Sequence, residues 1–266
     1  MLNYPALEAN RDTYRQQFQN AKPFRHLVMD NFLEPEVAEA AFQRFPAMAQ
    51  MDSLKDMRQS KAQDPDLSKF DELYQRIVFE HLQSPRLLRF LEQVTGMGIL
   101  LPDPQLYASG LAQGENGSFL NVHIDNSSHP VQPWYRRLNL LVYLNRNWTE
   151  AKGGHIELWS KDMSGAVAIL PCFNRAVIFA TDRTSWHGHR HVNTPDGDTR
   201  KSINVYYFSE QSPTGKSYYH VTSFRGRKGE LMNQLVYPVD NFLRSTLRKL
   251  RPKKDGHAVL FEQDDT

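Results

Sequence analysis

Two histidines and an aspartate are the residues of this chain whose types and spacing point most directly to chemistry. His123 and Asp125 stand two positions apart in the segment Asn-Val-His-Ile-Asp, and His187 follows in Trp-His-Gly. In a β-strand alternate side chains share one face, so His123 and Asp125 would converge on one point. A further imidazole at that point completes a set of two histidines and one carboxylate, which occupies one face of an octahedral Fe(II) ion and leaves the other positions open.

The second histidine of such a set has several candidates. His187, His189 and His191 alternate along the chain, so strand geometry alone would let any of them face the metal. For His189 and His191 the sequence leaves open a place beside the ligands, a place facing the substrate, and plain exposure. We interpret His129 and His155 as surface or structural residues.

A possible carboxylate clamp follows downstream. Arg200 and Ser202 lie two apart in Arg-Lys-Ser-Ile-Asn-Val-Tyr-Tyr-Phe, which alternates in polarity and is rich in β-forming residues, as in a strand. The two side chains would share a face, and a guanidinium fork with a hydroxyl beside it matches the far carboxylate of a small diacid. We therefore predict a site for 2-oxoglutarate, with its keto-acid end on Fe(II) and its other end on Arg200.

Taken in order, these segments resemble the catalytic core of the 2-oxoglutarate/Fe(II)-dependent dioxygenases of the prolyl 4-hydroxylase-like superfamily. Between the metal pair and the arginine, the matching segments are Leu-Val-Tyr143-Leu-Asn, Gly153-Gly154-His-Ile-Glu-Leu-Trp and Val177-Ile-Phe. The close resemblance covers roughly a third of the chain, and a looser one starts near residue 20.

The resemblance implies a role for each matching residue. The family's metal ligands fall on His123, Asp125 and His187, its 2-oxoglutarate arginine falls on Arg200, and Tyr143 falls where some members touch the same carboxylate. It also implies Fe(II), 2-oxoglutarate as cosubstrate and O2, with hydroxylation of an unactivated carbon and release of succinate and CO2.

One departure from the family pattern bears on the substrate. Ten residues before the first metal histidine, hypoxia-type prolyl hydroxylases carry a tyrosine that helps to hold the cosubstrate, whereas this chain has Gln113. This difference weakens the inference that the substrate is a prolyl residue of a protein. A prolyl peptide, a free amino acid and a small metabolite or saccharide all stay open as substrates.

Other functions fit parts of the same pattern. Two histidines and an aspartate can also hold zinc in a hydrolase or in a cupin-like metal enzyme, but hydrolysis needs no diacid clamp such as Arg200 and Ser202. A non-catalytic jelly-roll binding module with a vestigial metal site would have no reason to keep all these residues. Halogenase relatives replace the metal carboxylate to make room for halide, whereas Asp125 is present here.

Composition limits the remaining possibilities. The chain has 266 residues, 40% hydrophobic content and a net charge of +2, which is ordinary for a globular protein and gives no global sign of nucleic-acid or acidic-membrane binding. The single Cys172 excludes an internal disulfide framework. Without an apolar leader segment or a long apolar run, we expect a cytoplasmic protein that has a small-molecule or peptide substrate and no nucleic-acid or membrane partner. Its oligomeric state is not predicted.

Helices are expected in the first third of the chain, packed on the outside of a sheet. A strand over 23–33 leads into a helix that starts near Pro35, because proline and flanking glutamates suit the first helical turn. The segment 48–65, rich in Met and Asp, is predicted to be an irregular loop over the site. Further helices are expected at 7–18, at 67–82 and from Ser84-Pro85 onward.

From Gly96 the pattern changes to short strands separated by Gly, Pro and Asn. About eight such strands suggest a sandwich or barrel, and a double-sheet jelly roll is a common solution of this size. The predicted fold class is therefore α+β, mainly β: a double-stranded β-helix (jelly roll) core with supporting N-terminal helices and a C-terminal helix, and with the site at the open end between the sheets. The strands are expected at 106–109, 119–122, 138–144, 155–159, 166–170, 175–180 and 202–208.

We predict one domain over residues 1–266, with a strand and supporting helices in 1–96 and the jelly-roll core in 97–210. The stretch 211–266 would supply a C-terminal helix at 239–250 and a frayed tail. Basic residues are dense around 225–228 and 244–254; a solvated helix face and tail is the preferred interpretation, and an anionic partner is the alternative.

Overall fold

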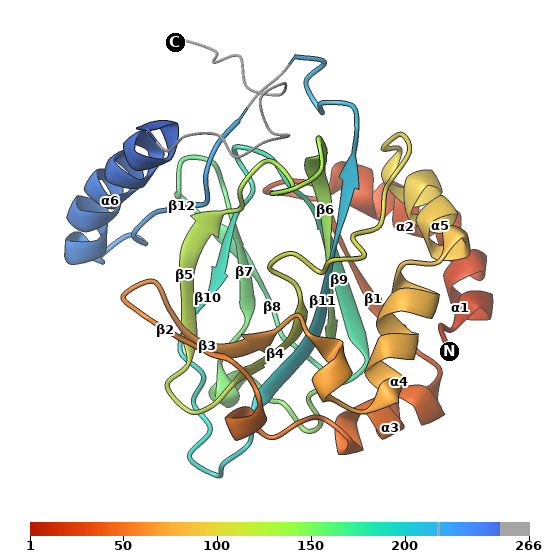
Figure 1. The fold of residues 1–266 in the computed structure, drawn as a ribbon. Coiled ribbons are helices and arrows are strands. Elements are labelled where there is room, and N and C mark those ends of the chain that lie inside the picture. Colours follow the sequence, from red (N-terminus) through yellow and green to blue (C-terminus); the bar gives the residue numbers. More distant parts are fainter. Residues whose placement is uncertain (217–218, 251–266) are drawn as a thin grey trace.

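The computed structural model describes residues 1–216 and 219–250, and in this part of the chain 12 strands form one antiparallel sheet that curls on itself (Figure 1). This confirms the predicted jelly-roll-like, mainly β core with helices at both ends. The strands are β1 (His26–Asp30), β2 (Ser53–Lys55), β3 (Gln59–Asp64), β4 (Gly110–Gly114), β5 (Phe119–Ile124), β6 (Tyr135–Tyr143), β7 (Ile156–Trp159), β8 (Ala166–Ile169), β9 (Arg175–Ala180), β10 (Trp186–His189), β11 (Arg200–Ser209) and β12 (Ser223–Phe224).

The strand order is β1-β9-β6-β11-β4-β3-β5-β10-β7-β8, with β2 on β3 and β12 on β5. Figure 1 shows two facing walls: β1, β9, β6 and β11 form one, and β5, β10, β7 and β8 form the other. β3 and β4 connect them, because β3 pairs with β4 through Ala62–Asp64 and with β5 through Gln59 and Ser60. The space between the walls is the natural place for a site.

Strand β6 illustrates how alternation separates the two faces of a wall. Leu138, Leu140 and Val142 are fully buried in the main hydrophobic cluster, together with apolar residues of the N-terminal helices. The alternate residues Asn139 and Leu141 line the cavity between the walls. Because the side-chain period of a strand is two, one face of β6 binds the helices and the other faces the site.

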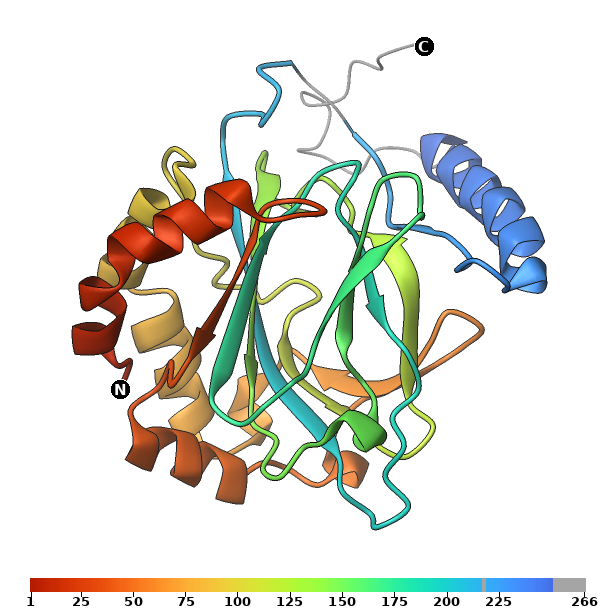
Figure 2. The same ribbon diagram turned by 180° about the vertical axis from the view of Figure 1, so that it is seen from behind.

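Helices cover the outer face of the first wall and leave the second wall to a single helix (Figures 1 and 2). Helix α5 follows from its sequence: Ser84 caps its first turn by accepting from the Leu87 amide, and Gly96 ends it in the left-handed conformation. The helices are α1 (Tyr4–Ala9), α2 (Arg11–Asn20), α3 (Pro35–Gln43), α4 (Glu72–Gln75), α5 (Pro85–Thr95) and α6 (Leu231–Leu250), with 3-10 turns η1 (Met48–Gln50), η2 (Leu67–Lys69) and η4 (Glu150–Lys152) and the π-helix η3 (Arg76–Leu82).

Two predictions about local structure were wrong. The segment 48–65 is not an irregular loop, because β2 and β3 form a hairpin that joins the sheet through pairing with β4 and β5. The segment 106–109 is a turn rather than a strand. There the Asp103 carboxylate accepts hydrogen bonds from the backbone amides of Gln105 and Tyr107, and Leu106 and Ala108 adopt positive φ.

Two helix boundaries also differ from expectation. The segment 67–82 is divided into a 3-10 turn, α4 and η3 instead of one helix. Helix α6 begins at Leu231 and includes Pro238, so it starts eight residues before the predicted 239. The predicted frayed tail at 251–266 lies outside the described residues. Among the described helices, none has the length and apolar character needed to cross a bilayer.

Candidate active site

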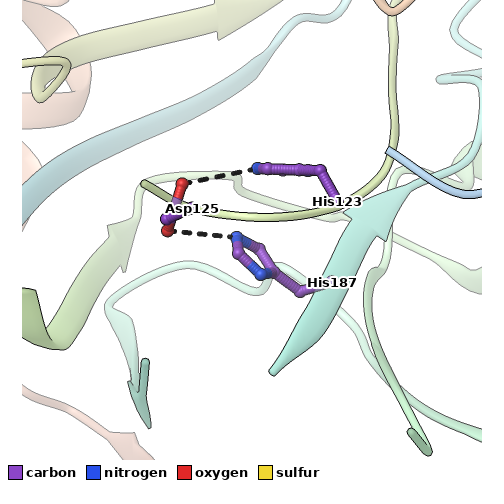
Figure 3. A group of neighbouring side chains, drawn as sticks. All are labelled: His123, Asp125 and His187. Atoms are coloured by element: carbon purple, nitrogen blue, oxygen red, sulfur yellow. Dashed lines mark ion pairs between the residues drawn. The ribbon is translucent and has the colours of Figure 1, made fainter. Parts of the chain in front are cut away.

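The structure brings His123, Asp125 and His187 to one point between the walls (Figure 3). His123 Nε2 lies 3.6 Å from Oδ1 of Asp125, and His187 Nε2 lies 3.6 Å from Oδ2 of the same carboxylate. The centroids of the two imidazole rings are 4.3 Å apart. The three potential ligand atoms lie within 4.8 Å of one another. Two imidazole nitrogens and a carboxylate oxygen at this spacing form a donor set that fits a divalent transition metal such as Fe(II).

Pairing between β5 and β10 explains why residues far apart in sequence meet here. His187 pairs directly with His123 in the antiparallel register. Gly188 permits the close approach, because a Cβ at this position would lie only 2.7 Å from the Leu120 carbonyl oxygen. The glycine of Trp-His-Gly is therefore required by the contact between the two strands that carry the histidines.

The backbone holds both imidazole rings in one orientation. His123 Nδ1 lies 2.9 Å from the carbonyl oxygen of Asn121, and His187 Nδ1 lies 2.9 Å from that of Ser185. A carbonyl only accepts, so Nδ1 carries the proton in each ring and Nε2 presents its lone pair to the cluster. Such support of a metal-binding histidine fixes its tautomer and raises its basicity.

Two residues of β6 hold the Asp125 carboxylate. Asn139 Nδ2 donates to its Oδ2 over 2.7 Å, and Arg136 Nη1 lies 3.1 Å from the same oxygen. Burial alone would raise the pKa of Asp125, but Arg136 and then the two imidazoles hold the pKa well below its usual range. Burial and the neighbouring His123 lower the pKa of His187 to about 4. At neutral pH the site therefore offers a charged carboxylate and a neutral His187 imidazole, as metal binding requires.

The other two candidate histidines lie outside this cluster. His189 is buried and lines the same cavity, and burial followed by the charge of Arg200 holds its pKa well below the usual value. His191 is exposed, with its ring 5.0 Å from that of Phe119. The two positions that the sequence left open thus have different surroundings, and neither belongs to the described His/Asp cluster.

Arg200 lies on the facing wall, in a buried position prepared by its neighbours. Its Nε donates to the Gly154 carbonyl over 2.7 Å, and its Nη2 donates to the Tyr143 hydroxyl over 3.2 Å. Gly154 makes room for it, since a Cβ there would lie 2.9 Å from the Arg200 side chain. In the described part of the chain Nη1 has no hydrogen-bond acceptor, so one arm of the guanidinium is free for a ligand.

One cavity of about 500 Å³ connects the triad with Arg200 and Ser202. Several buried polar atoms on its wall lack a protein partner within the described residues: Ser202 Oγ, Asn204 Oδ1, Asn139 Oδ1 and Arg136 Nε and Nη2. Buried polar atoms normally have partners, so an unpaired group of them marks a place that a polar ligand fills. A small dicarboxylate fits these requirements at the Arg200 end, where the hydroxyl and the guanidinium lie together.

Gln113, the position at which the chain departs from the hypoxia-type prolyl hydroxylases, does not line the cavity. Gln113 is buried in β4, where its amide donates to the Thr199 hydroxyl over 2.7 Å, whereas its neighbour Ala112 lines the cavity. Tyr143 is fully buried behind Arg200 and meets the cavity only through that contact. Gln113 therefore acts in packing β4 against the segment that leads into β11.

Sequence reasoning did not identify Asn139 and Lys61 as cavity residues, and for Arg136 it left a place in a substrate pocket and plain packing equally open. Arg136 and Asn139 are three apart, and a regular strand would place them on opposite faces. The register between β6 and β11 shifts between Tyr207 and Phe208, so that β6 has one extra residue and both side chains reach Asp125. For Asn139 the sequence signal was a polar residue inside the apolar segment Leu138–Leu144, and for Arg136 it was the position shortly after the metal pair.

Comparison with known proteins agrees with this geometry. Residues 109–208 match the family model of the 2OG-Fe(II) oxygenase superfamily. A Pseudomonas putida prolyl-4-hydroxylase superposes with a TM-score of 0.51 at 14% identity, covering 76% of this chain and 100% of the other. A Trichoplax adhaerens prolyl hydroxylase superposes with a TM-score of 0.53 at 20% identity, covering 78% of this chain and 92% of the other. A Phytophthora capsici prolyl 4-hydroxylase superposes with a TM-score of 0.55 at 20% identity, covering 92% of this chain and 76% of the other.

At these identities the structural likeness concerns the fold, while the family match covers the strands from β4 to β11 that surround the cavity. Members of this family use Fe(II), 2-oxoglutarate and O2. Residues 109–208 are thus similar to the 2OG-Fe(II) oxygenase superfamily, and the fold of the chain is similar to that of solved prolyl 4-hydroxylases.

Proposed function

We propose that this chain is a dioxygenase that hydroxylates an unactivated carbon of a small molecule or of a peptidyl residue, prolyl included, and releases succinate and CO2. In this proposal His123, Asp125 and His187 hold Fe(II). Arg200 and Ser202 bind the distal carboxylate of 2-oxoglutarate, and the Tyr143 hydroxyl assists from behind Arg200.

One observation carries the proposal: two complementary sets of ligand-binding atoms open on the same cavity. At one end stand the Nε2 atoms of two imidazoles and a carboxylate. At the other stand one guanidinium arm of Arg200 and the Ser202 hydroxyl, neither of which has a hydrogen-bond partner in the described part of the chain. A keto diacid is a ligand that can use both ends at once, chelating the metal and pairing with Arg200.

The protein's own residues position the reactants and exclude water. When bound, Fe(II) activates O2 and couples the oxidative decarboxylation of 2-oxoglutarate to oxidation of the substrate. Asn139 and Arg136 keep Asp125 ionised and oriented, and the two backbone carbonyls keep both rings aimed at the same point. The apolar side chains of Leu141, Ile156 and Phe179 line the cavity and limit the access of water to it.

A titration of 2-oxoglutarate into the anaerobic Fe(II)-loaded protein tests the proposal. We expect saturable binding, which is monitored through the metal-to-ligand absorption of the chelate. Exposure to air should then yield succinate, with faster production when a substrate from a panel of peptides, amino acids and metabolites is present. A zinc hydrolase would bind no 2-oxoglutarate, so absence of the absorption in the wild-type protein would contradict the proposal.

A further inference from the structure

The cavity wall carries positive charges that differ in how they are neutralised. Arg58 and Arg244 both pair with Asp240, at 3.3 and 2.9 Å, and so belong to a surface network. Arg136 pairs with Asp125. Arg200 and Lys61 are the lining cations for which the described residues supply no carboxylate.

Lys61 is the less expected of these two. It lies on β3, the strand that connects the two walls, and its partly buried side chain lines the cavity. Within residues 1–216 and 219–250 it forms no ion pair and no hydrogen bond through its ammonium group. Burial, and the positive charge of Arg200, lower the pKa of Lys61 to about 8 despite the opposing effect of Asp125. An ammonium group that is partly removed from water is stabilised by an anionic partner.

The ligands of the proposed function do not supply that partner. Fe(II) brings two positive charges and Arg200 one, while 2-oxoglutarate brings two negative charges and Asp125 one, so these four groups balance. Arg136 and Lys61 then add two positive charges, whereas Asp52, the other acidic residue in the described cavity wall, is exposed and lies beside Lys69. Uncompensated buried charge is unfavourable, so the loaded site favours one more anionic group.

We propose that the primary substrate is anionic, with a carboxylate or phosphate group that pairs with Lys61 in the cavity. The inference rests on the proposed function, because the charge balance assumes Fe(II) and 2-oxoglutarate. Arg136 adds to the positive potential through its buried Nε and Nη2, for which residues 1–216 and 219–250 supply no hydrogen-bond partner. The cavity volume of about 500 Å³ suits small molecules, so the anion belongs to a substrate of that size or to a single side chain of a peptide.

The test compares probes that differ in charge but little in shape. The wild-type protein, loaded with Fe(II) and 2-oxoglutarate, is offered L-glutamate and L-glutamine, L-aspartate and L-asparagine, and O-phosphoserine and serine, each free and within a short peptide. Binding is measured by calorimetry under anaerobic conditions, and succinate formation is measured in air. We expect the acids to bind and to stimulate turnover more than their neutral counterparts, with the free and peptidyl arms identifying the source of the anion.

Substitutions then connect this preference to one residue. Lys61→Met should weaken the response to acids about ten- to a hundredfold and leave the response to neutral probes unchanged. Lys61→Arg should keep the preference, and Lys61→Glu should reverse it toward amine-bearing analogues. Lys55→Met is the matched control, since Lys55 lies on β2 of the same hairpin, is exposed and does not line the cavity.

Two results would overturn the inference. One is that a wild-type protein that binds 2-oxoglutarate normally shows no preference for acids, either because acids and neutral probes give equal binding and turnover or because no acid binds. The other is that Lys61→Met raises the KM for 2-oxoglutarate instead, which would assign Lys61 to the cosubstrate. Failure of the proposed function is separate, because the wild-type protein would then give no 2-oxoglutarate absorption before any probe is added.

Discussion

The two ends of the cavity differ in how their polar atoms are held. At the triad, the Nδ1 atoms contact backbone carbonyls and Asp125 is held by Asn139 and Arg136. At the opposite end, the described residues supply no partner for the buried Ser202 Oγ or for one arm of Arg200. Protein contacts thus hold the three ligand side chains of the first end, whereas atoms of Arg200 and Ser202 at the second end are available for a ligand.

This difference predicts distinct outcomes for substitutions at the two ends. A change at the triad should abolish activity through loss of the metal. A change at the other end should act on 2-oxoglutarate affinity and leave metal binding intact.

The largest effect is expected from Asp125→Ala. It removes one of three ligands and the negative charge of the site, so hydroxylation should be lost even at saturating iron. Succinate formation together with a direct measurement of bound iron checks this expectation. Retained turnover in this variant would show that the metal lies elsewhere.

Arg200→Ala should come next. A charge-assisted hydrogen bond to a buried carboxylate contributes ~1.5–3 kcal/mol, and a bidentate fork makes two of them, so 2-oxoglutarate should bind roughly two orders of magnitude more weakly. Arg200→Lys should be intermediate, since it keeps the charge and loses the fork. The anaerobic absorption titration measures both variants, with iron affinity in the absence of 2-oxoglutarate as the control; identical curves for Arg200→Ala and wild type would mean that the clamp lies elsewhere.

Asn139→Ala tests whether support of a ligand matters at the triad. Loss of the 2.7 Å hydrogen bond to Asp125 leaves Arg136 as its remaining partner on β6. Such a loss typically costs about tenfold or more in metal affinity, so iron binding should weaken while the KM for 2-oxoglutarate at saturating iron stays close to wild type. A competition assay with a chelator measures the first quantity. An unchanged iron affinity would indicate that Arg136 alone is sufficient.

Ser202→Ala should have a smaller effect at the other end. It removes one neutral hydrogen bond, worth ~1 kcal/mol, and so should raise the KM for 2-oxoglutarate about fivefold. Since the Ser202 hydroxyl has no hydrogen-bond partner among the described residues, thermal stability in the absence of ligand should not fall. A fall in the melting temperature of the ligand-free protein would instead assign the hydroxyl a structural role.

The smallest effect on the metal is expected from His189→Ala. His189 lines the cavity but lies outside the cluster of ligand atoms, so iron affinity should remain within about twofold of wild type. His187→Ala is the matched comparison and should lose iron. If His189→Ala loses iron while His187→Ala keeps it, the second histidine ligand is His189 and not His187.

The amino-acid sequence by itself indicated much of this protein. Its alternation of apolar and polar residues predicted most strands, because the side-chain period of a strand depends on local backbone geometry. The spacing of His123 and Asp125 and that of Arg200 and Ser202 identified two groups on shared faces for the same reason. Proline and serine at Ser84-Pro85 marked the start of α5, since helix caps are also local features.

Only the tertiary structure decided how these groups meet. Strand geometry alone did not separate His187 from His189 and His191; pairing of β10 with β5 places His187 beside His123, and this contact leaves no room for a Cβ at Gly188. An extra residue in β6 brought Arg136 to Asp125, against the parity that its spacing predicts. The hairpin of β2 and β3 joins the sheet because β3 pairs with β4 and β5, and this pairing places Lys61 in the cavity wall. The polar sequence of the hairpin did not predict this pairing. Register, bulges and close approach arise between segments distant in sequence, so local patterns carry no record of them.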